Sequence, residues 1–292
     1  MKNPVVIFLL LAGQTVVAQE LTGTSNPLMI EVGKKPTPSE TKAPAQISPA
    51  DLGLTNIPPY YALIIGVSDY RFTGPGLPNL DMPVKDAERL YSILTTRYAF
   101  KQEHVTLLKN PTREEIINQM DHLASVVTDK DNLLVFYAGH GYYDKSKEFG
   151  YWLPSDAKKT STSAWISNSQ IKDYMGAIKS KHTLLITDAC FGGSIFKTRS
   201  VETMIRKFYD LYHDQSRKAL TSGNLSEVPD QSIFIKYLLK VLEESSDPFL
   251  PASILFARIY EPVSNNAPVA PQFGVIQGAG DEGGDFIFIK NN

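Results

Sequence analysis

Two short, uninterrupted apolar runs constrain the fold of this chain more than any other feature of its sequence. Leu133 to Tyr137 is followed by Ala-Gly-His-Gly, and Thr183 to Thr187 is followed by Asp-Ala-Cys-Phe-Gly-Gly. Short apolar and β-branched runs bounded by glycine are typical of strands buried on both faces of a parallel sheet. His140 and Cys190, the only cysteine in 292 residues, therefore each follow the carboxyl end of a predicted strand, the edge where open α/β sheets bind ligands.

Strand and helix patterns alternate along the rest of the chain. The remaining predicted strands are Tyr60 to Val67, His104 to Leu108, Lys218 to Ser222 and Asp285 to Ile289. The predicted helices are Pro83 to Tyr98, Thr112 to Val127, Ile166 to Ile178, Ser232 to Leu242 and Pro251 to Tyr260. We expect a polar loop from Gly141 to Gly150 and a Pro/Asn/Gly-rich loop after Tyr260. The alternation predicts a parallel sheet covered by helices on both sides.

The two strand ends carry the residue types of a nucleophile and its base. A protonated thiol is a weak nucleophile, and a nearby imidazole that takes its proton supplies the reactive thiolate. If the two strands are neighbours, His140 and Cys190 face each other across the sheet edge although about fifty residues separate them. The alternatives are a hydrogen-bonded histidine at a strand end and a small buried cysteine without chemistry.

At these residues the chain resembles the caspase-like cysteine peptidases, in particular the metacaspase, orthocaspase and paracaspase branch. Members carry one strand that ends in His-Gly and a second that ends in Asp-x-Cys, matched here by His140-Gly141 and by the Asp-Ala-Cys that ends at Cys190. The resemblance covers about residues 60–289. It implies a caspase-like α/β/α sandwich with a mostly parallel, six-stranded sheet, and a cysteine endopeptidase that hydrolyses peptide bonds through the His140/Cys190 dyad. It also implies that backbone N–H groups of Gly141 and Cys190 stabilise the oxyanion.

The resemblance further implies that the peptidase cuts after Arg or Lys. In this branch an Asp early in the first helix and an Asp two residues before the cysteine bind the basic side chain, and Asp86 and Asp188 match these positions. Two carboxylates argue against the Asp specificity of true caspases, which bind Asp with an arginine. The alternative roles are purely structural: Asp86 complements a helix N-terminus and Asp188 holds a loop. Many members have His or Ser after the cysteine; Phe191 stands there in this chain, so pocket shape and calcium dependence are not carried over.

Two other functions stay open on the same fold. One is a catalytically inactive caspase-like binding module, in which the fold persists as a scaffold. The other is a transpeptidase or sorting enzyme, because an amine in place of water can resolve an acyl-enzyme. Sequence alone does not separate them from a hydrolase.

The N-terminal part of the chain predicts export. Residues 1–18 combine a basic Lys2, an apolar run and a small-residue end at Val16-Val17-Ala18, as in a secretory signal peptide, although a retained anchor is the alternative. Residues 19–59 are rich in Pro, Ser and Thr and are predicted to form a linker or a pro-segment, and residues 60–292 the peptidase domain. We expect a secreted or periplasmic protein. If the enzyme prefers basic residues, the candidate cut points in a pro-segment are Lys34, Lys35 and Lys42. The resemblance also implies self-cleavage between the cysteine strand and the next strand, where the candidates are Lys197, Arg199, Arg206, Lys207 and Arg217; the alternative for this segment is a solvated helix.

Composition narrows the partners and cofactors. With 29 basic and 31 acidic residues the net charge is -2, so the charge balance gives no reason to expect nucleic acid as a partner, or a membrane once the signal is removed. The resemblance implies protein or peptide substrates. A single cysteine without a close His pair lacks the spacing of a zinc site, so no metal is assigned. Calcium activation stays open without an assignable site, because the cluster of Asp281, Glu282 and Asp285 is predicted to be a solvated turn.

Overall fold

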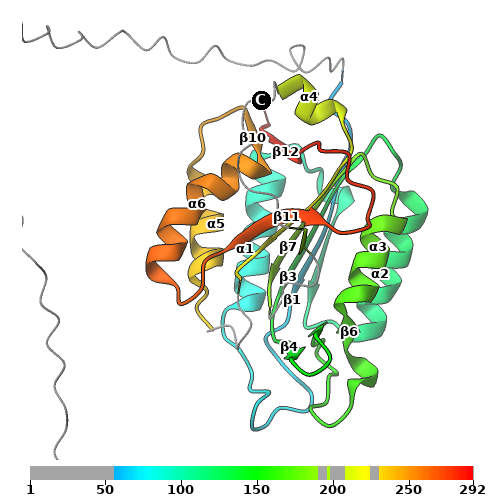
Figure 1. The fold of residues 1–292 in the computed structure, drawn as a ribbon, viewed down its shortest axis with the longest axis vertical. Coiled ribbons are helices and arrows are strands. Elements are labelled where there is room, and N and C mark those ends of the chain that lie inside the picture. Colours follow the sequence, from blue (N-terminus) through cyan, green and yellow to red (C-terminus); the bar gives the residue numbers. More distant parts are fainter. Residues whose placement is uncertain (1–55, 190–195, 198–207, 224–229, 292) are drawn as a thin grey trace, which may run out of the picture. The chain divides into compact units, whose positions relative to one another are not determined.

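The structure is a computed structural model that describes residues 56–189, 196–197, 208–223 and 230–291. Its main sheet has the strand order β2-β1-β3-β7-β9-β11-β8 (Figure 1). These strands are β1 (Tyr60–Gly66), β2 (Val105–Lys109), β3 (Asn132–Ala138), β7 (His182–Asp188), β8 (Phe196–Lys197), β9 (Ser216–Thr221) and β11 (Gln272–Ile276). The five strands from β2 to β9 are parallel and β11 is antiparallel to β9. The predicted six-stranded, mostly parallel sheet is thus confirmed, and the two-residue β8 adds a further strand beside β11.

Helices cover both faces of this sheet, as predicted (Figure 1). One face carries α1 (Pro83–Arg97), α5 (Ile233–Glu244) and α6 (Ala252–Asn266), and the other carries α2 (Arg113–Val126) and α3 (Asn168–Ala177). The shorter helices are α4 (Phe208–His213) and the 3-10 turns η2 (Gln102–His104) and η3 (Thr162–Ala164). Strand side chains alternate between the two faces, so that Ile64 belongs to the core under α1 and Ile65 to the core under α2.

Local sequence signals explain where the helices begin. Thr112 and Glu115 form a reciprocal capping box at α2, and the hydroxyls of Ser167 and Ser232 accept hydrogen bonds from the first turns of α3 and α5. α1 has no such cap: it begins at Pro83, and its N-cap residue, Met82, makes no side-chain hydrogen bond to the first turn. Proline suits that position because the missing N–H has no partner within a helix anyway.

Two smaller sheets correct the sequence-based assignment of the remaining segments. The predicted polar loop after His140 is instead a hairpin of β4 (Gly141–Asp144) and β5 (Phe149–Trp152), which β6 (Ile166–Ser167) extends. The predicted last strand of the main sheet is shorter, β12 (Ile287–Ile289), and pairs with β10 (Phe249–Pro251) in a separate sheet. β11, which lies in the predicted Pro/Asn/Gly-rich loop, supplies the sixth main strand instead.

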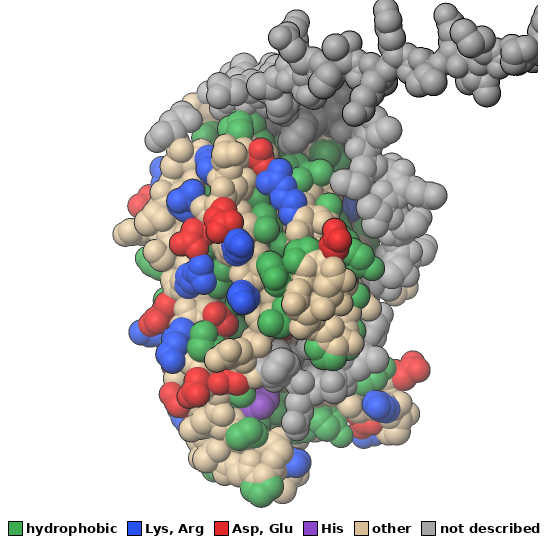
Figure 2. Space-filling model, turned by 90° about the vertical axis from the view of Figure 1, so that its left-hand side faces the viewer, with side chains coloured by type: hydrophobic (Ala, Val, Ile, Leu, Met, Phe, Trp, Pro, Cys, Tyr) green, Lys and Arg blue, Asp and Glu red, His purple; other side chains and the backbone are tan. Residues whose placement is uncertain are grey.

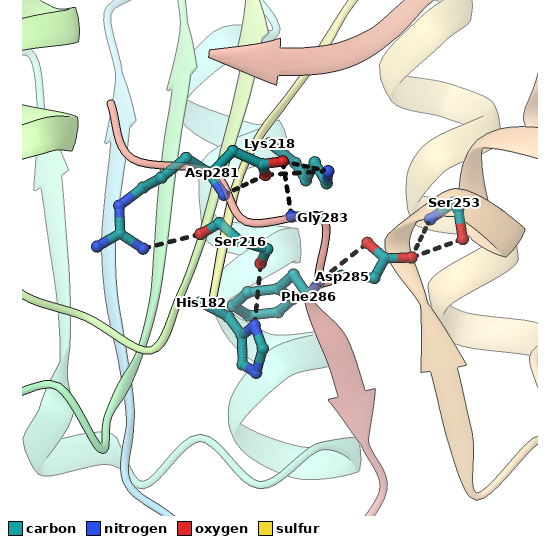
Figure 3. Close-up of polar contacts among 9 residues, drawn as sticks. His182, Ser216, Lys218, Ser253, Asp281, Gly283, Asp285 and Phe286 are labelled. Carbon is teal, nitrogen blue, oxygen red and sulfur yellow. Dashed lines mark hydrogen bonds and ion pairs between the residues drawn. The ribbon is translucent and has the colours of Figure 1, made fainter. Parts of the chain in front are cut away.

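Buried polar contacts join the segment before β12 to β9 and to the start of α6 (Figure 3). Asp281 forms an ion pair of 2.9 Å with Lys218, and both side chains are largely buried. Asp285 is 2% exposed, and one carboxylate oxygen accepts hydrogen bonds from the N–H and the hydroxyl of Ser253. The predicted solvated acidic turn is therefore wrong for Asp281 and Asp285, whose side chains are buried, whereas Glu282 is exposed.

The helical face formed by α1, α5 and α6 carries interspersed basic and acidic side chains (Figure 2). Arg89 of α1 and Glu243 of α5 form an ion pair across this layer, with both side chains about half exposed. Such exposed pairs contribute little to stability, typically about 0–1 kcal/mol. Within the part of the chain that the structure describes, every helix is too short or too polar to cross a membrane.

Candidate active site

Two neighbouring strands bring the predicted site residues to one edge of the sheet. β3 and β7 pair in parallel from Asn132 and His182 to Ala138 and Asp188, so their carboxyl ends lie side by side. His140 follows β3 by two residues, and Asp188 is the last residue of β7. Cys190 lies outside the described residues, which reach Ala189 on this side. The predicted adjacency of the two strands is confirmed, while the distance between the dyad side chains remains a prediction.

The imidazole of His140 is held in one orientation by a backbone carbonyl. The residue is 8% exposed, and its Nε2 lies 2.8 Å from the carbonyl oxygen of Pro78. A carbonyl oxygen can only accept a hydrogen bond, so in the neutral ring Nε2 carries the proton and Nδ1 is the basic nitrogen. His140 can therefore take a proton at Nδ1 while the loop after β1 holds the opposite side of the ring. The sequence analysis missed Pro78, because a backbone carbonyl leaves no signature in the residue types.

Gly141 directly follows His140 and begins β4, where it pairs with Trp152 of β5. Its backbone is partly buried. The structure thus places this predicted oxyanion donor at the same sheet edge as the imidazole. The second predicted donor is the N–H of Cys190, which lies outside the described residues.

Asp188 is a buried carboxylate without full hydrogen-bond compensation. It is 4% exposed, and among the described residues its Oδ1 has no hydrogen-bond partner. Burial raises the pKa of Asp188 to about 6, and the nearby hydroxyls of Ser232 and Ser222 offset part of that rise. A carboxylate of this kind gains more from a cationic partner than one that water already solvates.

Asp86 lies in the first turn of α1, close enough to Asp188 for the charge of Asp188 to affect its pKa. Burial raises the pKa of Asp86 to about 6, the negative charge of Asp188 raises it further, and Arg89 opposes both effects. Gly66, the last residue of β1, allows the start of α1 to pack closely against that strand, because a Cβ on it would lie 2.6 Å from the carbonyl oxygen of Pro83. The structure thus brings the two predicted substrate-binding carboxylates close enough for one to influence the pKa of the other, and their role in substrate binding stays a prediction.

A third carboxylate, which the sequence analysis missed, joins this acidic group. Asp230 also raises the pKa of Asp86, so its charge acts on the same region. Its Oδ1 accepts hydrogen bonds from the N–H groups of Asp81 (2.6 Å) and Met82 (3.0 Å) just before α1. In the sequence Asp230 stands two residues before the N-cap of α5 and looks like an ordinary acidic residue at a helix start. We call Asp86, Asp188 and Asp230 the acidic group.

The other candidate residues have different roles or cannot be placed. The assignment of Arg217 as a candidate self-cleavage position is wrong, because the residue is 1% exposed in β9. Its guanidinium donates to the carbonyl oxygens of Ser216 and Ser180. His182 is fully buried, with its pKa lowered to about 3 by burial, and is structural as expected. Lys197 is in β8. The remaining cleavage candidates, Lys34, Lys35, Lys42, Arg199, Arg206 and Lys207, lie outside the described residues. Among the described residues no cluster of three His, Cys, Asp or Glu is arranged to hold a metal ion.

Comparison with known proteins identifies the family. A search of curated proteins gives no match. Among solved structures, the chain is similar to caspase-1 from Spodoptera frugiperda, with a TM-score of 0.53 and 19% identity over 75% of this chain and 87% of that one. It is also similar to protein GSU0716 from Geobacter sulfurreducens, with a TM-score of 0.51 and 16% identity over 78% of this chain and 100% of that one. The family model of the caspase domain matches residues 60–267, so the chain belongs to the caspase domain family.

Proposed function

We propose that this protein is a cysteine endopeptidase that hydrolyses peptide bonds after Arg or Lys through a His140/Cys190 dyad. Membership of the caspase domain family suggests cysteine peptidase activity in general, and caspase-like proteases act on protein substrates. The observation that supports the basic specificity is the acidic group at the sheet edge of His140. Asp188, buried and incompletely hydrogen-bonded, is matched to a substrate cation and would repel the acidic side chain that caspases bind.

The proposed reaction uses the basic Nδ1 of His140. The thiol of Cys190 transfers its proton to Nδ1, and the sulfur attacks the carbonyl carbon of the substrate Arg or Lys. The carbonyl oxygen takes up the electron pair, and the N–H groups of Gly141 and Cys190 stabilise the resulting oxyanion. When the C–N bond breaks, the leaving amine takes the proton from the imidazolium and a thioester remains. Water then gives a proton to Nδ1 and hydrolyses the thioester, which releases the carboxylic acid and restores the thiol.

The carbonyl of Pro78 contributes to this cycle by orientation. Its hydrogen bond to Nε2 keeps Nδ1 as the nitrogen that receives and returns the proton, and it stabilises the imidazolium when both ring nitrogens are protonated. It therefore serves the role that a carboxylate serves in a triad, without a second titrating group.

A peptide-library cleavage profile tests activity and charge preference together. We expect cleavage after Arg and Lys by the wild type, and a loss of several orders of magnitude in Cys190→Ala and in His140→Ala at unchanged circular dichroism. Unchanged turnover in Cys190→Ala would contradict the assignment of His140 and Cys190 as the catalytic dyad. Preferred cleavage after Asp or after large apolar residues would contradict the assignment of Asp86 and Asp188 to substrate binding, without contradicting the dyad. An added amine acceptor that appears in the products would identify a transpeptidase.

We also propose that the protein is exported, on the signal pattern of residues 1–18. Purification of the mature protein from the producing cell should give an N-terminus at Gln19. A mature chain that begins at Met1 would contradict this, and an N-terminus after Lys34, Lys35 or Lys42 would favour the pro-segment.

A further inference from the structure

Two buried tyrosine hydroxyls hydrogen-bond to the backbone of His140. The N–H of His140 donates to Oη of Tyr70 at 2.8 Å. Its carbonyl oxygen accepts from Oη of Tyr137 at 2.8 Å and from the N–H of Leu153 at 3.1 Å. The two tyrosines come from different places in the chain, since Tyr137 lies in β3 and Tyr70 in the loop after β1. The backbone of one strand-end residue is therefore fixed by contacts with separate segments.

Tyr70 links the backbone of His140 to the group that orients its side chain. The N–H of Tyr70 donates to Oδ1 of Asn79 at 2.9 Å, and Asn79 follows Pro78, whose carbonyl oxygen accepts from the imidazole. The phenol ring also lies against the imidazole, with 5.0 Å between ring centroids and an interplanar angle of 47°. The contacts form a closed circuit that runs from the His140 N–H through Tyr70 and Asn79 to Pro78, and back to Nε2 of His140.

Gly139 lies where the two hydroxyls converge. Its φ is +154°, and a Cβ on it would lie 3.1 Å from Oη of Tyr137, from Oη of Tyr70 and from Cβ of Val67. A contact of that length with three atoms at once leaves no room for a side chain without displacement of the hydroxyls. Glycine before His140 therefore lets the hydroxyl groups reach the backbone.

The hydroxyl of Tyr70 does not itself exchange protons with a substrate. Tyr70 is 4% exposed, and burial raises the pKa of its hydroxyl well above the usual value, so that it stays protonated over the working pH range. Its effect on the reaction has to pass through His140.

We propose that Tyr70 is a positioning residue, which holds the His140 imidazole with Nε2 toward the carbonyl oxygen of Pro78, so that Nδ1 is the nitrogen that receives the thiol proton. This proposal rests on the proposed function. It differs from a role in folding alone, because it predicts an effect on the ring tautomer and on kcat rather than on stability. The phenol ring fills space in both cases, and only the hydroxyl separates the two roles.

The test compares Tyr70→Phe with Tyr260→Phe, which removes the hydroxyl of an exposed tyrosine on α6. For Tyr70→Phe we expect kcat to fall about tenfold to a hundredfold, as for small misplacements of a catalytic group, with KM changed less than about twofold. Nitrogen-15 shifts of the imidazole should show a single Nε2–H tautomer in the wild type and in Tyr260→Phe, and a mixture in Tyr70→Phe. An unchanged kcat or an unchanged tautomer in folded Tyr70→Phe overturns the proposal.

Two further measurements keep the test decisive. If Tyr70→Phe does not fold, Asn79→Ala opens the same circuit on the loop side and should give the same tautomer mixture and the same fall in kcat; a single tautomer overturns the proposal. If the wild type hydrolyses no peptide, the proposed function has failed, and the tautomer alone then decides whether Tyr70 positions the ring.

Discussion

Replacing Asp188 by Asn should stabilise the protein and at the same time impair substrate selection. The carboxylate is 4% exposed, and burial raises its pKa from 3.8 to about 6. A difference of about two pKa units corresponds to about 3 kcal/mol between the charged and the neutral form. At pH 8 the charged carboxylate therefore lowers the free energy of unfolding by about that amount, relative to a neutral group in its place.

The pH dependence gives the sign of this effect. Because the folded-state pKa lies above the unfolded value, the stability contributed by protonated Asp188 is fully present below about pH 4 and is lost as the pH rises through about 6. Asn does not titrate. Asp188→Asn should therefore match the wild type near pH 4 and exceed its free energy of unfolding by up to about 3 kcal/mol at pH 8, or by about 6–12 °C in Tm for a domain of this size.

Urea unfolding of both proteins across this pH range measures the difference directly. Asp285 has a raised pKa in the same window and contributes equally to both proteins, so only the difference between them reports Asp188. In the same variant, kcat/KM for Arg and Lys peptides should fall at least about tenfold relative to neutral peptides, because breaking a buried charge pair costs about 2–5 kcal/mol. A variant that is less stable at pH 8, or equally stabilised at both pH values, would refute the reasoning.

Two further predictions concern the same edge of the sheet. The ratio of kcat/KM for Arg peptides to that for neutral peptides should rise from pH 5 to pH 7, because Asp86 and Asp188 both lose their protons near pH 6; a flat ratio in this range would contradict the assignment. Gly66→Ala should lower the free energy of unfolding by about 1–3 kcal/mol in urea, because its Cβ would lie 2.6 Å from the Pro83 carbonyl oxygen. An unchanged midpoint would show that α1 moves away without cost.

Elements with strong local patterns were predictable from the sequence. The runs before His140 and Cys190 consist of apolar and β-branched residues bounded by glycine, which is typical of strands buried on both faces, and the two strands are neighbours in the sheet. Asp188 was predictable as part of a motif on one of these strands. β11 was not, because Gly274 interrupts a five-residue strand that follows a Pro- and Asn-rich stretch. Its pairing with β9 is a tertiary preference that overrides a weak local one.

The parts of the candidate site that escaped prediction depend on contacts between distant segments. The carbonyl of Pro78 acts through a backbone atom that every residue possesses. The hydroxyl of Tyr70 reaches the backbone of His140 across 70 residues. Asp230 and Asp86 come together only because the segment before α5 crosses the start of α1. None of these contacts has a sequence spacing that could have indicated it.

The contact between β1 and β12 also limits the order in which the protein can fold. The hydroxyl of Tyr60 donates to the carbonyl oxygen of Ile287, 227 residues later, and Phe286 and Phe288 are completely buried in the core under α1. The core under α1 can therefore be completed only after the ribosome has synthesised residue 289. Contacts of such long sequence separation slow folding. Until residues 286–289 have been made, the core under α1 lacks two of its phenylalanines, and the buried hydroxyl of Tyr60 lacks its acceptor.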